Sequence, residues 1–149
     1  MKLQKFVSPP RIALGPMIWH GDCASSEFVM SPFNTLTFVA EWIDSWRSRD
    51  LDLILSHYAE NVEYTSPITL KHMPESGGTL RGKEELRAYF EQALEIYNES
   101  PFELLHHTKG IRSIVLVYRS INELIVAEMM EADDDGKIMR VCAHFGGSD

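Results

Sequence analysis

One acidic residue, Glu128, interrupts an apolar run that extends from Leu124 to Met130. The run has the length and composition of a β-strand, and the acidic segment Asp133–Gly136 after it favours a hairpin turn. A carboxylate in such a strand either points to water or is buried in a sheet that is covered on both faces. Because burying a charge is costly, a buried glutamate has a partner or an altered pKa. Such groups are candidate acid/base residues, although structural ones also occur.

Histidine is the second residue type here that could carry acid/base chemistry, and the chain has six. His106 shares a strand face with Phe102 and Leu104, so it is expected to point inward and to pair with Glu128 as an acid/base couple. A lone inward histidine can equally be a hydrogen-bonded core residue. His144 is expected on the outer face of the sheet. No histidine, cysteine or carboxylate arrangement has the spacing of a metal site, so neither a metal nor a cofactor is expected.

The composition is that of an ordinary soluble domain, with 44% hydrophobic and 24% charged residues in a chain of 149. The net charge is −8 and no basic stripe is present, so neither nucleic acid nor an anionic membrane is an expected partner. Cys23 and Cys142 are too far apart in the sequence to suggest a disulfide framework. No apolar stretch approaches the roughly 18 residues that span a membrane, and no continuous apolar signal segment is seen. A cytoplasmic location is the expectation.

The elements that must position these residues begin after an unusual N-terminal segment. Residues 1–33 contain several prolines and glycines, which leave no room for a long regular element. This segment is either a disordered arm or an extended strap, or it precedes a natural start at Met30. A single domain is expected over residues 34–149.

The first half of that domain is mainly helical. Apolar side chains recur with helical spacing at Leu36, Val39, Ile43 and Trp46. A shorter helix is then expected over 51–57, a short strand over 62–66, an irregular loop over 68–82 and a long helix over 84–97. The second half has strand periodicity over 102–109, 111–119, 123–132 and 137–145. Their short links predict an antiparallel meander, and helices followed by a sheet indicate an α+β fold.

Motifs in this order and spacing resemble the SnoaL-like branch of the nuclear transport factor two superfamily, which also contains ketosteroid isomerase. The likeness is carried by Trp42–Trp46 with Arg49–Leu51, Tyr58–Pro67, Arg81–Leu86 with Tyr89 and Phe90, and Gly136–Ile138 with Ala143–Phe145. The resemblance implies a cone-shaped, barrel-like α+β fold, in which a curved and mostly antiparallel sheet wraps around three N-terminal helices and a central pocket. It also implies a homodimer through the outer face of the sheet. The fold alone does not imply one activity, because it hosts enzymes and non-enzymatic modules.

The resemblance assigns three isomerase positions to residues of this chain. Ketosteroid isomerase uses an aspartate base, with a tyrosine and a protonated aspartate that hold the oxyanion. The tyrosine position falls on Trp42, whose indole can donate one hydrogen bond but cannot transfer a proton as a phenol does. The base position falls on Ser66, a very poor base, and the protonated-acid position falls on Glu128. Steroid isomerase activity is therefore not expected.

If Glu128 faces the pocket, strand alternation places it in an apolar wall, where desolvation is expected to raise its pKa. The expected catalytic residues are Glu128 and His106. The residues expected to contact a substrate are Trp42, Tyr64, Ser66, Tyr118, Val126, Met130, Val141 and Phe145. One hypothesis is a cofactor-free isomerase, cyclase or dehydratase that acts on an apolar molecule with a carbonyl group. The other is a non-catalytic module of the same fold that binds a ligand or another protein.

Overall fold

The structure, a computed structural model, describes residues 33–96, 102–120 and 123–146. The predicted arm over residues 1–33 therefore lies outside the described residues except for its last position, as do Met30 and Cys23.

Two helices open the domain, and each begins at a side-chain cap. Helix α1 (Thr35–Ser48) starts at Asn34, whose side chain accepts a hydrogen bond from the backbone N–H of Thr37 over 3.3 Å. Helix α2 (Leu51–Leu55) starts at Asp50, which accepts from the backbone N–H of Leu53 over 3.0 Å. Between them Arg49 takes the left-handed conformation that commonly ends a helix. The helix predicted from the spacing of Leu36 to Trp46 is confirmed, and so is the one predicted over 51–57, which ends at Leu55.

Six strands form one mixed sheet that does not close on itself. The strands are β1 (Tyr58–Thr65), β2 (Thr79–Arg81), β3 (Glu103–Gly110), β4 (Ser113–Arg119), β5 (Ile125–Ala132) and β6 (Ile138–Phe145). Their order is β2-β1-β6-β5-β4-β3, and every neighbouring pair is antiparallel except β1 with β6. The predicted meander of four strands is confirmed.

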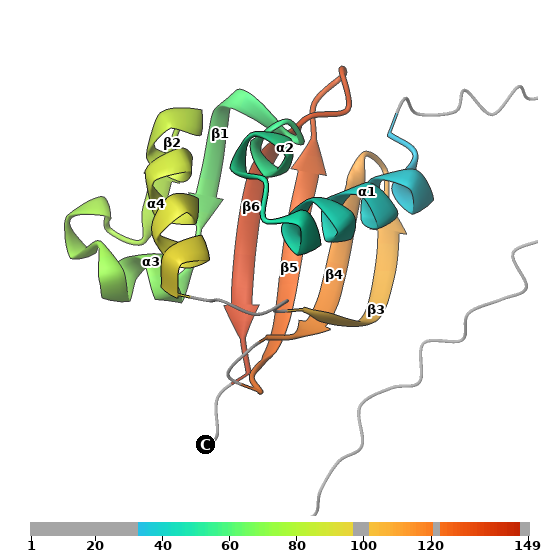
Figure 1. Cartoon of the computed structure of the whole chain (residues 1–149). Helices are drawn as coiled ribbons and strands as arrows, with labels where there is room; N and C mark the ends of the chain where they lie inside the picture. The colour runs from blue at the N-terminus through green and yellow to red at the C-terminus, as the bar shows by residue number, and fades with distance from the viewer. Residues whose placement is uncertain (1–32, 97–101, 121–122, 147–149) are drawn as a thin grey trace, which may run out of the picture.

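Helices α1, α2 and α4 (Lys83–Ile96) lie over the same face of the curved sheet (Figure 1). The inward side of α1 buries Phe38, Val39, Trp42 and Trp46 against the sheet, as the helical spacing predicts. The core is therefore a single layer between helices and strands, and the predicted α+β cone is confirmed.

The segment 68–82 is more regular than the irregular loop that was predicted. It contains the end of helix α3 (Pro67–His72), a 3₁₀ turn η1 (Pro74–Ser76) and strand β2. The predicted strand over 62–66 ends just before Pro67, where a proline is expected to stop a strand, but proline also suits the first turn of a helix because no N–H is needed there. The same residue ends β1 and begins α3.

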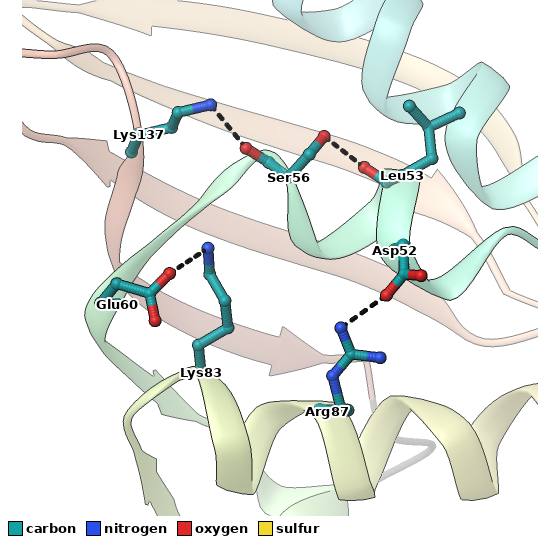
Figure 2. Close-up of polar contacts among 7 residues, drawn as sticks. All are labelled: Asp52, Leu53, Ser56, Glu60, Lys83, Arg87 and Lys137. Atoms are coloured by element: carbon teal, nitrogen blue, oxygen red, sulfur yellow. Dashed lines mark hydrogen bonds and ion pairs between the residues drawn. The ribbon is translucent and has the colours of Figure 1, made fainter.

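Polar contacts join helices α2 and α4 to one another, to the start of β1 and to the turn before β6 (Figure 2). Arg87 of α4 pairs with Asp52 of α2 over 2.6 Å, and Lys83 pairs with Glu60 of β1 over 2.8 Å. The Lys137 ammonium donates to the backbone carbonyl of Ser56 over 2.6 Å. Exposed ion pairs of this kind contribute at most about 1 kcal/mol each, so they orient the helices more than they stabilise them.

Among the residues that the structure describes, none of the helices has the length and apolar character that a membrane span requires.

Candidate functional site

A cavity of about 120 Å³ lies between helices α1 and α4 and the inner face of the sheet. Most of its wall is aromatic: Trp42, Trp46, Tyr58, Tyr64, Tyr89, Phe90, Phe102, Tyr118 and Phe145. The remaining lining residues are Arg49, Ile68, Ala93, Leu94, Ser120, Leu124, Val126 and Glu128. The cavity therefore suits an apolar molecule, with few polar groups to orient it.

Glu128 reaches this cavity from the middle of the sheet. It pairs with Leu116 of β4 and Ala143 of β6, and only 3% of it is exposed. Val126 and Met130, two residues to either side, are fully buried on the same face. The inward orientation predicted for Glu128 is confirmed.

The Glu128 carboxyl is held by tyrosine hydroxyls. Tyr118 donates to Glu128 Oε2 over 3.2 Å, across the β4–β5 pair. Burial raises the pKa of Glu128 to about 7, although hydrogen bonds from Tyr118 and Tyr64 lower it by favouring the charged form. A carboxyl with this pKa exists in both protonation states near neutral pH, so it can accept a proton and return it.

A second polar pair, between Trp42 and Tyr58, lines the same cavity. The indole Nε1 of Trp42 donates to the Tyr58 hydroxyl oxygen over 3.1 Å, so the single donor predicted for Trp42 is used there. Burial, and secondly the charge of Glu128, raises the pKa of Tyr58 far above its ordinary value of 10, so the phenol keeps its proton. Because the oxygen already accepts from Trp42, the hydroxyl is oriented as a donor.

Stacked rings hold these groups in place. Trp42 stacks on Phe102 with ring centroids 5.7 Å apart, and Phe102 meets Tyr118 edge to face at 4.9 Å. Trp46 meets Phe90 of α4 at 4.9 Å. Aromatic pairs in these arrangements are worth about 0.5–1.5 kcal/mol beyond the area they bury, which makes the wall stiff.

Seven of the eight residues predicted to contact a substrate divide into two groups. Lining the cavity are Trp42, Tyr64, Tyr118, Val126 and Phe145. Met130 and Val141 face the same side of the sheet but are buried in the core and do not line the cavity. For these two residues, strand alternation gives the correct face but not the height at which the cavity ends.

Ser66, predicted as a substrate contact, is a helix cap instead. It is 2% exposed, and its Oγ accepts a hydrogen bond from the backbone N–H of Ile68 over 3.2 Å at the start of α3. It does not line the cavity. The hydroxyl of Ser66 therefore stabilises the start of α3.

The predicted inward orientation of His106 is wrong, because β3 contains a bulge. Leu104 pairs with Tyr118 but His106 pairs with Val117, so Leu105 has no partner in β4. One extra residue reverses the alternation, which turns His106 to the outer face, where it is exposed. His107 pairs with buried Leu116 instead. No acid/base couple forms between His106 and Glu128.

The sequence interpretation missed three kinds of cavity residue. Tyr58 precedes the strand predicted over 62–66, but it begins β1 and shares its inward side with Val62 and Tyr64. This spacing of apolar and aromatic residues was the signal that could have identified it. Phe90 belongs to a clear helical pattern, yet periodicity cannot separate packing from cavity lining. Arg49 follows the last turn of α1, and no sequence pattern marks it as a cavity residue.

The side chains that commonly bind metals do not gather at one place among the described residues. No group of three or more histidine, cysteine, aspartate or glutamate side chains among them could hold a metal ion.

The chain matches the family of SnoaL-like domains over residues 39–146. A SnoaL-like protein of unknown function from Burkholderia thailandensis is 35% identical, with a TM-score of 0.71 over 75% of this chain and 93% of that chain. No curated protein matches the chain.

Two more distant structures have the same fold. One is named as a putative polyketide cyclase from Sinorhizobium meliloti, with 13% identity and a TM-score of 0.59 over 72% of this chain and 94% of that chain. The other is named as a putative ketosteroid isomerase from Kribbella flavida, with 14% identity and a TM-score of 0.57 over 76% of this chain and 78% of that chain.

Proposed function

The chain belongs to the family of SnoaL-like domains, and on this basis we propose that it is an enzyme that performs acid/base chemistry on a small apolar molecule with a carbonyl group. The observation that carries the proposal is Glu128, a buried carboxyl with a pKa raised to about 7 that lines an aromatic cavity. Structures of the same fold named as a putative ketosteroid isomerase and a putative polyketide cyclase support an isomerisation or cyclisation.

In the proposed reaction, the substrate carbonyl oxygen accepts a hydrogen bond from the Tyr58 hydroxyl. The hydrogen bond from Trp42 to Tyr58 makes that hydroxyl a stronger donor, because linked hydrogen bonds polarise one another. As negative charge moves to the carbonyl oxygen, a donor in a water-poor cavity stabilises it. Tyr58 thus takes the role of the oxyanion donor, and Trp42 orients and polarises its hydroxyl.

Glu128 moves the proton. Its carboxylate removes a proton from the carbon beside the carbonyl, and the electron pair of that C–H bond moves to form an enolate. The resulting Glu128 carboxylic acid then returns the proton, either to another carbon in an isomerisation or to an oxygen after ring closure. Tyr118 holds Oε2 throughout, and Tyr64 also donates to the carboxyl, so the two hydroxyls orient it toward the substrate. One residue that removes and returns one proton leaves the reaction redox-neutral.

The second candidate is a binding module that holds an apolar ligand without changing it. Two observations favour it: Tyr118 and Glu128 satisfy one another, as do Trp42 and Tyr58, and Ser66 caps a helix where the isomerase has its base. In that case, the polar pairs are structural and the cavity recognises shape alone.

Exchange of ketone α-protons with heavy water, followed by NMR, separates the two candidates. Acetophenone derivatives with α-hydrogens are suitable probes, since they match the aromatic wall. We expect wild-type protein to accelerate exchange and Glu128→Gln to lose at least about a hundredfold of it. Glu131→Gln is the matched control, because Glu131 lies on the same strand and pairs with Arg140 at the surface. Binding that shifts the Trp42 indole signal without any exchange would favour the binding module.

A further inference from the structure

We propose that the ligand extends out of the cavity between α3 and α4, passes over Ala93, and places a neutral polar group beside His72 and Gln92. The substrate is then an elongated molecule, with an apolar carbonyl-bearing head and an arm that ends in a hydroxyl or an amide. This inference rests on the proposed function, because it assigns a substrate class to the same site. It concerns residues that take no part in the acid/base step, so it can fail separately.

A second, smaller hollow adjoins the cavity. It has a volume of about 30 Å³ and is lined by Ile68, His72, Tyr89, Gln92, Ala93 and Ile96. Three of these residues, Ile68, Tyr89 and Ala93, also line the main cavity. Because the same side chains bound both spaces, the wall between the two is one side chain thick.

This wall follows the seam between α3 and α4, which is loosely packed. Ile68 comes from α3, whereas Ala93 comes from α4, which lies beside α3 (Figure 1). Helix α3 packs on η1, β2 and β6, and α4 packs on α2, β1 and β2, with few close contacts between the two helices. Ile68 and Ala93 are only partly buried, whereas Trp42 on the α1 side of the cavity is buried. Since protein interiors are normally close-packed, this seam is where the wall can admit part of a ligand.

Ala93 sets the size of the passage. Tyr89, Ala93 and Ile96 lie on one side of α4, because spacings of four and three residues place side chains in successive turns. Tyr89 and Ile96 are large, whereas Ala93 between them carries only a methyl group. Helix α4 therefore leaves a gap at the wall, and the side chain at position 93 decides how wide a ligand can pass.

His72 and Gln92 supply polar groups at the outer end of the passage. Both side chains are exposed, and neither makes a hydrogen bond or an ion pair with another described residue. A glutamine amide has two N–H donors and an acceptor oxygen, and a neutral imidazole has one donor and one acceptor. None of the described residues that line the hollow carries a fixed charge. The pair therefore suits a neutral group that both donates and accepts, such as a hydroxyl or an amide.

An apolar arm joins this end to the cavity. On its way out it covers Ile68 and Ile96, and Ile96 is 61% exposed in the unliganded protein. Removing such apolar surface from water favours binding. The head remains in the aromatic cavity beside Tyr58 and Glu128, as the proposed acid/base step requires. An elongated ligand thus binds in one orientation.

Three ketones test this inference: acetophenone, para-pentylacetophenone and para-(hydroxybutyl)acetophenone with a terminal hydroxyl. The two long ketones have arms of equal length, and they differ only in a terminal methyl or hydroxyl. Affinities are measured from the indole N–H signal of Trp42 in an NMR titration. We expect wild-type protein to bind the hydroxybutyl ketone about tenfold more tightly than acetophenone. It should bind the hydroxybutyl ketone at least as tightly as the pentyl ketone, because hydrogen bonds offset the smaller apolar surface.

One substitution closes the passage. In Ala93→Leu, both long ketones should bind no more than about twofold more tightly than acetophenone, because the larger side chain fills the gap. Acetophenone should still shift the Trp42 signal, which shows that the cavity remains open to the head. Ala88→Leu is the matched control, because Ala88 is exposed on the same helix and lines neither hollow. It should keep the full advantage of the long ketones.

A second variant tests the polar end without filling the passage. With His72→Ala and Gln92→Ala combined, the protein should bind the pentyl ketone more tightly than the hydroxybutyl ketone, because the hydroxyl then has no partner in the hollow. The combined variant Lys71→Ala and Glu91→Ala is its control. Lys71 and Glu91 are the exposed neighbours of the two residues in the sequence, and neither lines the hollow.

Four results would overturn the inference. These are equal affinities of wild-type protein for all three ketones, an advantage of the long ketones that persists in Ala93→Leu, loss of acetophenone binding in that variant, and a hydroxyl preference that persists without His72 and Gln92. In each case, loss of α-proton exchange in Glu128→Gln would leave the proposed function standing. Failure of every ketone to bind wild-type protein would overturn the inference and the proposed carbonyl-binding site together.

Discussion

Glu128 links the stability of the protein to pH. Its pKa is 4.5 in an ordinary setting, and burial raises it to about 7 in the folded protein. Between these values the folded state binds more protons than the unfolded state, so stability falls as pH rises. The contribution of the Glu128 carboxyl to the free energy of unfolding is fully present below its pKa of 4.5 in the unfolded chain. It is lost as pH rises through its pKa of about 7 in the folded protein.

The first prediction is therefore a difference between wild type and Glu128→Gln. Between about pH 5 and about pH 8, the free energy of unfolding of wild type should fall by about 2–3 kcal/mol relative to the variant. Urea denaturation at each pH measures both proteins, and contributions of the other carboxylates cancel in the difference. A difference that does not change with pH would show that Glu128 has an ordinary pKa in the folded protein.

The second prediction concerns Tyr118. Its hydrogen bond favours the charged form of Glu128, so Tyr118→Phe should raise the pKa of Glu128 further. Tyr64→Phe should act in the same direction. Carboxyl NMR with labelled glutamate measures the pKa directly, and the pH at which α-proton exchange becomes fast should move upward with it. An unchanged or lowered pKa in Tyr118→Phe contradicts the assigned role of the hydroxyl.

At the scale of elements, Ser66 shows how one position can change its role within a shared fold. Its Oγ caps helix α3, and it has no place in the cavity lining. Ser66→Ala should therefore lower the free energy of unfolding by about 1 kcal/mol, as the loss of a helix cap does. It should leave ligand affinity and α-proton exchange unchanged. A loss of exchange in a protein that remains folded would return Ser66 to the site.

Local pattern predicted the strands, because alternation needs only neighbouring residues, whereas the inward face of Glu128 was predicted only with the help of the family resemblance. It could not predict the bulge at Leu105, since one unpaired residue leaves the composition of β3 unchanged. Strand β3 lies at the edge of the sheet, where bulges are common. The error at His106 follows from this one position. Pro67 misled in another way, because one proline both ended β1 and began α3.

The cavity belongs to the scale of the whole molecule. Its wall combines residues of α1, α3, α4 and four strands, so its extent depends on how far the helices stand from the sheet. Periodicity identified the inward faces of α1 and α4 but not the gap between them. Trp46, on the apolar side of α1, and Tyr89, on α4, both line the cavity. Tyr58 and Arg49 were recognisable as site residues only after β1, α1 and α4 had been placed together.

The outer face of the sheet carries partly exposed apolar side chains. Helices α1, α2 and α4 cover the inner face (Figure 1), while Val115 and Val117 of β4 and Ala127 and Met129 of β5 remain partly exposed on the other. Val117 and Ala127 are paired neighbours near the centre of this surface. Exposed apolar patches of this kind commonly mark an interface.

We expect two copies of the chain to pair through this outer face, because an antiparallel sheet with an apolar outer surface is stabilised when a second sheet covers it. Native mass spectrometry should then show a species of twice the 17.0 kDa chain. Val117→Lys should dissociate it by placing a charge at the centre of the interface, while its Trp42 indole signal remains that of wild type because the cavity lies on the opposite face. Leu53→Lys, which changes an exposed residue on α2, should leave the dimer intact. A wild type that is monomeric at all concentrations, or a dimer that survives Val117→Lys, would place any self-association on another surface.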